Sequence, residues 1–143
     1  MKEPGIHLIE NFHLQEINMD FMGYELEKDD IFTFHHLIIP NCKKGPYELW
    51  NGAILCGKTS HPYLHVIEQT DVDLFFLLTC EIIDQNIKGY LDYNNLLRIR
   101  YLLMCFEEKY IANHTCNIKI KEEYFKRPPV NQILTRTRRL KNK

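Results

Sequence analysis

The sequence has no Cys-x-x-Cys pair, no apolar run long enough to cross a bilayer, no internal repeat and no low-complexity stretch. Its five cysteines form an odd set, which argues against a disulfide framework and a four-cysteine zinc site, and fits a reducing cytosol. No basic-then-apolar signal segment opens the chain. We therefore expect a soluble, cytoplasmic protein that does not associate with membranes.

Net charge is also small, a formal −1 over 143 residues, but this average hides an asymmetry. Residues 119–143 hold nine Lys or Arg and two Glu, a balance of +7, so the preceding 118 residues carry −8. A basic end behind an acidic body is compatible with a polyanionic partner such as nucleic acid, and equally with a solvated terminus. Apolar residues make up 45% of the chain and charged residues 26%, which is the balance of a globular domain.

Apolar residues at helical spacing predict two helices, at about 71–88 and about 93–110. Asp71 is a suitable N-cap for the first, and Cys80 falls within its apolar pattern, where we expect it to fill the core. The first 30 residues are ambiguous between helix and strand. Because Pro128 and Pro129 break any continuing helix, we expect a single domain over 1–127 followed by a basic C-terminal tail over 128–143.

The segment at about 31–68 predicts a strand, a loop, a second strand and a helix. Residues 31–39 are rich in β-formers and end at Pro40, and residues 41–50 contain the Lys, Gly and Pro of a loop. A short apolar run at 53–56 is long enough for a second strand. Ser60 can then cap a helix that carries Pro62 in its first turn.

Four of the seven histidines fall within this segment. His61 and His65 are four residues apart, so on a helix they share one face and can bind one metal ion. His35 and His36 are neighbours on the predicted strand and point to opposite faces, so that one can bind a metal while the other stays available as a base.

Together, His35, His61 and His65 would supply three nitrogen ligands and leave positions for water and substrate, as in a catalytic metal site. Imidazole suits zinc, nickel or manganese better than magnesium. A zinc peptidase is disfavoured, because Pro62 stands where the peptidase motif needs its glutamate.

The segment HHLIIPNCKKGPYELWNGAILCGKTSHPYLH, residues 35–65, resembles the ββα-metal motif (His-Me finger) of HNH endonucleases. Its pattern is similar to the variant with a doubled first histidine and an H-x-x-x-H ending that is found in DNase-type colicins. The resemblance implies an α+β fold, mostly helical overall, in which additional α-helices pack around this core. Many members of the family carry Gly-Gly in the loop where this chain has Lys44 and Gly45.

The resemblance also implies an activity, the metal-dependent hydrolysis of DNA phosphodiester bonds. It makes His36 the general base and Asn51 the residue that holds this base in orientation. The divalent metal, which could be zinc, nickel, manganese or magnesium, would be bound by His35, His61 and His65. No arginine matches those that assist phosphate binding in some members, so Lys43, Lys44 and Lys58 are our candidates for phosphate contacts.

Two other functions stay open at this stage. One is a non-catalytic nucleic-acid-binding protein that retains the HNH fold, which the basic C-terminal end favours. The other is a toxin-type nuclease with a cognate inhibitor protein. An origin in a phage or mobile element fits the small size, and a homodimer would be expected if both strands of DNA are cut.

Overall fold

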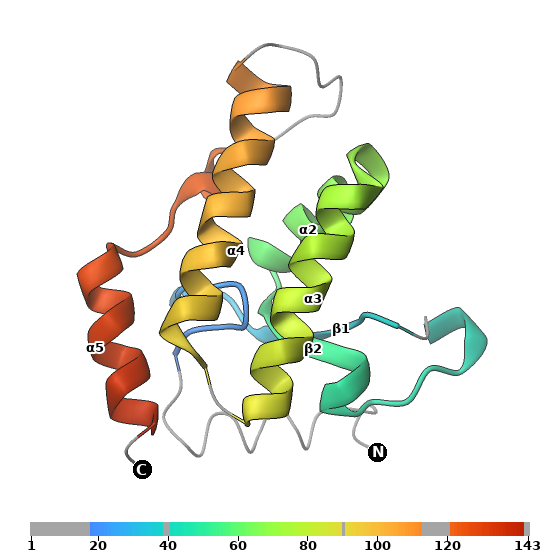
Figure 1. Ribbon diagram of the computed structural model, residues 1–143. Helices are drawn as coiled ribbons and strands as arrows, with labels where there is room; N and C mark the ends of the chain where they lie inside the picture. Colours follow the sequence, from blue (N-terminus) through green and yellow to red (C-terminus); the bar gives the residue numbers. More distant parts are fainter. Residues whose placement is uncertain (1–17, 39–40, 90, 113–120, 142–143) are drawn as a thin grey trace.

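The computed structural model describes residues 18–38, 41–89, 91–112 and 121–141. The fold is mixed α+β and mostly helical, with a small antiparallel sheet. In chain order the elements are β1 (Phe32–His36), η1 (Asn41–Lys43), η2 (Leu49–Asn51), β2 (Gly52–Cys56), α2 (Ser60–Thr70), α3 (Val72–Lys88), α4 (Tyr93–Phe106), η3 (Glu107–Ala112), η4 (Glu122–Phe125) and α5 (Val130–Lys141). Figure 1 shows α3 and α4 side by side as a helical layer, with the sheet behind them.

The two strands confirm the strand, loop, strand and helix order that the sequence predicts, with shorter bounds for the first strand. They pair antiparallel, with Phe32 opposite Cys56 and His36 opposite Gly52. Gly52 is required by packing, since a Cβ atom there would lie 2.2 Å from the ring of Phe34. All of β2 is buried, and the amide of Asn86 in α3 donates to the Gly52 carbonyl at 2.7 Å, which ties the helical layer to the sheet.

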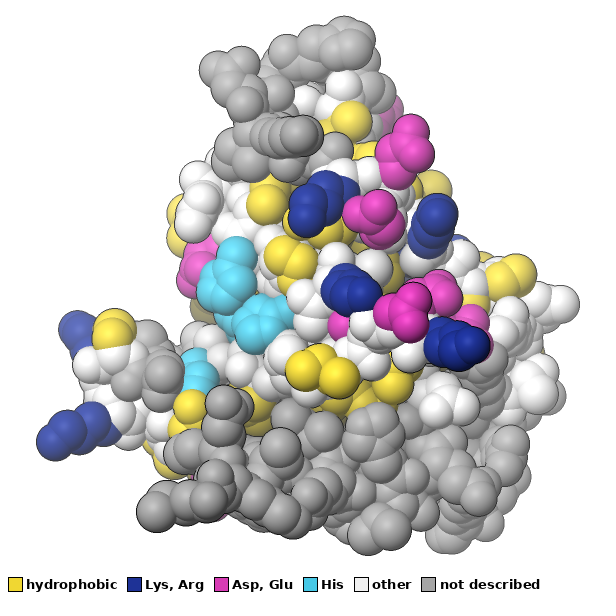
Figure 2. All heavy atoms as spheres, turned by 180° about the vertical axis from the view of Figure 1, so that it is seen from behind, with side chains coloured by type: hydrophobic (Ala, Val, Ile, Leu, Met, Phe, Trp, Pro, Cys, Tyr) yellow, Lys and Arg dark blue, Asp and Glu magenta, His cyan; other side chains and the backbone are white. Residues whose placement is uncertain are grey.

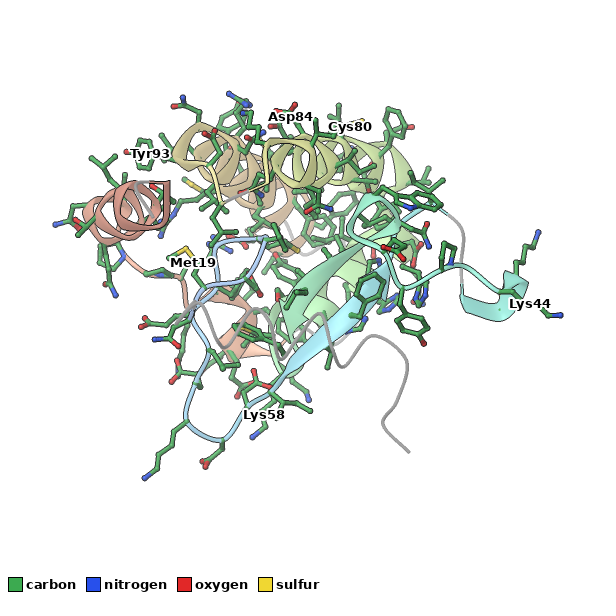
Figure 3. All side chains as sticks on the ribbon, turned by 90° about the horizontal axis from the view of Figure 1, so that it is seen from below. Met19, Lys44, Lys58, Cys80, Asp84 and Tyr93 are labelled. Atoms are coloured by element: carbon green, nitrogen blue, oxygen red, sulfur yellow. The ribbon has the colours of Figure 1, made fainter. Side chains whose placement is uncertain are left out.

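Helices α3 and α4 follow the predicted pattern closely. The Asp71 side chain accepts a hydrogen bond from the Leu74 amide and caps α3, as expected, and Gly89 ends this helix with a φ of 80°. The carboxylate of Asp92 caps α4 in the same way. The prediction for Cys80 is wrong: it is exposed, and Figure 3 shows it on the outer side of α3, away from the sheet.

The start of α2 differs from expectation. Thr59, not Ser60, is the N-cap residue, and it makes no side-chain capping bond. Ser60 is instead the first helical residue and donates its hydroxyl to the carboxylate of Asp20, which is completely buried. The same carboxylate accepts the backbone N–H groups of Met22, Tyr24 and Cys56, each at 2.9 Å. Asp20 therefore fixes residues 18–25 against both β2 and α2.

The C-terminal segment is not the tail that the two prolines led us to expect. Residues 130–141 form α5, which lies alongside α4 in Figure 1 and buries Ile133 in the core. The prolines end an irregular stretch rather than the fold, because Pro is compatible with the entry to a helix. Arg127 is also held firmly, since its guanidinium makes two hydrogen bonds of 2.7 and 2.8 Å to the Glu107 carboxylate. Over the described residues, no helix is both long enough and apolar enough to span a membrane.

Candidate metal centre

Three imidazole rings meet where β1 passes the first turns of α2. The ring of His35 lies 5.0 Å from that of His61 and 4.7 Å from that of His65, centroid to centroid. One ring nitrogen from each histidine falls in a group whose members all lie within 4.8 Å of one another. Figure 2 shows histidine side chains gathered on the face opposite to that of Figure 1.

The strand register explains how these rings converge. Alternate residues of β1 share a face, so His35 and Thr33 point to the side covered by α2, while Phe34 and His36 point to the other side. On α2, the spacing of four places His61 and His65 on one face, and their rings stack 5.1 Å apart. The structure thus brings together the three residues that the sequence selected as ligands.

Neighbouring groups contact the same nitrogen, Nδ1, in each helical ring. Nδ1 of His61 lies 2.5 Å from the Thr33 hydroxyl, which is also 3.0 Å from the Leu55 carbonyl. Nδ1 of His65 lies 3.2 Å from a Glu68 carboxylate oxygen, which only accepts. In the tautomer with the proton on Nδ1, these contacts are hydrogen bonds and Nε2 keeps its lone pair, the arrangement that second-sphere partners create for metal-binding histidines.

His35 is the most deeply placed of the three. It is 3% exposed, and its Nε2 is buried without a hydrogen-bond partner among the described residues. Burial, followed by the proximity of His61 and His65, lowers the pKa of His35 to about 3. Burial and the neighbouring His65 lower the pKa of His61 to about 4. Both rings are therefore neutral at physiological pH, the form that binds metal ions.

These observations fit a metal ligand set. A buried polar atom without a partner is rare in folded proteins, because it loses its hydrogen bonds to water and gains none in return. Zinc–imidazole bonds of about 2.0–2.1 Å in a tetrahedral site would need the nitrogens somewhat closer than 4.8 Å, a change within the reach of side-chain rotation. The three histidines could hold a metal ion.

His36 lies on the opposite side of β1, beside the loop that joins the strands. Its Nε2 is 3.1 Å from the Gly45 carbonyl, and its ring packs against Tyr47 at 4.6 Å and Phe34 at 5.1 Å. A carbonyl oxygen accepts only, so Nε2 carries the proton and Nδ1 carries the lone pair of the neutral ring. The charge of His36 also contributes to the lowered pKa values of His35 and His61, which places it within electrostatic range of the three rings.

Asn51 acts on the loop. Its amide nitrogen donates to the Pro46 carbonyl at 3.0 Å, and its amide oxygen accepts the backbone N–H of Ile38 at 3.1 Å. Pro46 follows Gly45 directly, so Asn51 fixes the peptide segment whose carbonyl faces the His36 ring. Asn51 and His36 thus contact neighbouring residues of the same loop, and the orienting role of Asn51 stays a prediction.

The three candidate lysines are not together. Lys43 and Lys44 are exposed in the loop between the strands, and Figure 3 shows Lys44 at its tip, well away from the sheet. Lys58 is exposed at the opposite end of the strand pair, where its backbone N–H donates to Asp30. The structure thus separates Lys58 from the other two.

Sequence reasoning missed the residues that orient the rings, namely Thr33, Glu68 and Gly45. A weak signal was present for two of them: Thr33 is two residues before His35, on the same face of the strand, and Glu68 follows His65 by one helical turn. For the Gly45 carbonyl there was none, because any residue supplies a carbonyl and only the loop conformation aims it.

Comparisons of this chain with protein-family models, curated proteins and solved structures find no match. The assignment of a function depends on the geometry of the site itself.

Proposed function

We propose that this protein is a metal-dependent endonuclease of the HNH type that hydrolyses phosphodiester bonds in DNA. The observation that carries the proposal is the buried Nε2 of His35, which has no partner in the described part of the chain and faces two further imidazoles. A separate histidine, His36, stands next to this group on the other side of the same strand. Three ligands and one neighbouring base are the set that the ββα-metal motif uses.

Each residue has a distinct role in the proposed reaction. Phosphodiester hydrolysis needs an in-line water, a group that takes its proton and a positive charge on the developing oxyanion. Nδ1 of His36 takes the proton, because the Gly45 carbonyl holds the other ring nitrogen in its protonated form. Asn51 keeps this carbonyl in place through Pro46. His35, His61 and His65 would hold a divalent ion, which would supply positive charge to stabilise the developing oxyanion.

The test is a nicking assay on supercoiled plasmid with a panel of manganese, nickel, zinc and magnesium. We expect cleavage with at least one ion, its loss in EDTA, and products with a 5′-phosphate and a 3′-hydroxyl. His36→Ala should lose at least about a hundredfold in rate, the usual contribution of a positioned general base, yet keep the metal-induced thermal shift. Added imidazole should restore part of the His36→Ala rate, which would not occur if His36 were only structural.

The other two functions give different results in the same assay. A non-catalytic nucleic-acid-binding protein would bind DNA in a salt-sensitive manner without cleaving it under any ion. A toxin-type nuclease would cleave DNA and also impair growth on expression, and His36→Ala would relieve the toxicity. Cleavage that is unchanged in His36→Ala would refute the base assignment.

A further inference from the structure

The loop between the strands forms an arm, residues 41–51, that projects from the body of the protein (Figure 1). Its tip carries the exposed Lys43 and Lys44, and Figure 3 shows Lys44 far from the sheet. At its foot, half of Trp50 is exposed, and Ile38 beside it is 55% exposed. The exposed indole offers a flat aromatic face to a binding partner.

The foot of the arm is fastened to the proposed base. Gly45 accepts from His36, and Pro46 accepts from Asn51, the residue that follows Trp50. Lys44 is therefore one peptide unit from the His36 contact on one side, and Trp50 is one peptide unit from Asn51 on the other. The Gly45 carbonyl is thus the point at which the arm contacts His36.

The backbone at the tip gives a second, independent observation. Lys44 has a φ of 61°, and within the described ranges it is the one residue other than glycine with a positive φ. A residue with a Cβ pays about 1 kcal/mol for this conformation, and glycine would adopt it freely. Residues held in such backbone conformations cluster at active sites, ligand clamps and switch regions.

We infer that the arm binds nucleic acid with unpaired bases, with Lys43 and Lys44 contacting the phosphates and Trp50 stacking on a base. This inference rests on the proposed function and names the form of its substrate. Aromatic stacking needs an exposed base face, which single strands offer and duplexes hide. Two lysines and one indole match the sparse contacts of a single strand better than the many phosphate contacts of duplex binding.

Trp50 is the sole tryptophan of the chain, so its fluorescence reports on the arm alone. We would titrate His36→Ala protein in EDTA with a single-stranded 12-mer and, separately, with its duplex. The single strand should quench the fluorescence and bind at least about tenfold more tightly than the duplex. In anisotropy measurements with labelled oligonucleotide, Trp50→Leu should weaken binding roughly 5- to 150-fold, the range for loss of one stacked base.

Lys44→Gly distinguishes an effect on nucleic-acid affinity from an effect on the stability of the fold. It removes the charge and relieves the backbone, so the melting temperature should stay equal or rise while affinity falls. The slope of log K against log salt should shrink by about 0.7, the value for one phosphate contact on a single strand. Lys28→Ala is the control, because Lys28 is an exposed lysine outside the arm and outside the proposed site, and it should leave the slope unchanged.

Failures of the two proposals look different. If the protein nicks plasmid but binds single strand and duplex equally, without quenching, the nuclease proposal stands and the proposed role of the arm is overturned. If single strands quench the fluorescence but no ion activates cleavage, the proposed role of the arm stands and the nuclease proposal is overturned. Equal losses of slope in Lys44→Gly and Lys28→Ala would show diffuse charge attraction and would overturn the assignment to the arm.

Discussion

Two buried polar residues flank the start of α2, and they differ in how their polar atoms are paired. Asp20 is completely buried, and its carboxylate accepts three backbone N–H groups and the hydroxyl of Ser60. His35 is 3% exposed, and its Nε2 has no partner within the ranges that the structure describes. Both side chains are shielded from water. The Asp20 carboxylate has hydrogen-bond partners from the protein instead, and Nε2 of His35 has none among the described residues.

His35 differs further in that its ring lies 5.0 and 4.7 Å, centroid to centroid, from two other imidazoles. Burial of a polar group costs free energy that hydrogen bonds within the protein can recover. The bonds to Asp20 recover part of it, and burial still raises the pKa of this carboxyl above its usual value. Nε2 of His35 has no such bond within the described ranges, so the folded protein holds an uncompensated cost beside two further histidines. Such a cost is expected where the compensation comes from a ligand, and the three histidines could hold a metal ion.

The largest expected effect on stability comes from Asp20, the residue whose polar atoms are paired. Asp20→Ala leaves four donors without their acceptor in the core, and we expect the free energy of unfolding to fall by about 4 kcal/mol, measured by urea denaturation. Asp30→Ala is the matched control, since Asp30 also accepts backbone N–H groups, at Ile31 and Lys58, but does so at the surface. It should cost about 1 kcal/mol. Equal effects of the two variants would show that burial does not set the value of these bonds.

Metal binding should stabilise the folded protein, because it would give the unpaired Nε2 of His35 a partner. At a metal concentration a hundred times the dissociation constant, the free energy of unfolding should rise by about 2.7 kcal/mol, seen as a higher melting temperature. His65→Ala should remove this increase without unfolding the protein, because the His65 side chain is 49% exposed. Glu68→Gln keeps the ligands but weakens the partner of His65, and should lower metal affinity about tenfold. A full thermal shift in His65→Ala would contradict the three-histidine site.

Lowering the pH should destabilise the metal-free protein through His35 and His61. The folded-state pKa values, about 3 for His35 and about 4 for His61, lie below the ordinary 6.5, so the unfolded chain takes up these protons first. Stability is therefore complete above pH 6.5 and falls as the pH drops toward 4, by about 1 kcal/mol per histidine between pH 6.5 and 5.5. Denaturation in EDTA at pH 7.5, 6.5 and 5.5 measures this loss. His35→Leu should show a smaller loss, and an identical one would remove His35 as its source.

The sequence predicted the elements around the site well, because their signals are local. Histidine spacing on a strand and a helix placed the ligands, and Asp71 marked the start of α3. Cys80 was misplaced because the apolar pattern of α3 is broad, and its neighbours do not reveal which side of the stripe faces the core. The helix after Pro129 was missed since two prolines read equally as the end of a fold or as the entry to a helix.

Tertiary pairing could not be predicted at all. The partner of Ser60 is 40 residues away at Asp20, and the partner of the His36 ring is a backbone carbonyl. Whether a buried polar residue is paired or unpaired depends on such long-range contacts. The comparison between Asp20 and His35, on which the metal site rests, is therefore visible only in the folded structure.

The smallest expected effect is the stability change caused by His35→Leu, and its sign shows whether Nε2 of His35 is unpaired. In metal-free protein at pH 7.5, His35→Leu removes an unpaired buried nitrogen and should raise the free energy of unfolding by about 1 kcal/mol, or the melting temperature by roughly 2–4 °C. Thr33→Val, on the same face of β1, removes a hydroxyl that is paired with Leu55 and His61, and should lower stability by a similar amount. Calorimetry of both variants in EDTA gives the two signs directly. If His35→Leu destabilised the protein as Thr33→Val does, then Nε2 of His35 would have a partner in the folded chain, and the cost that a metal ion is proposed to offset would not exist.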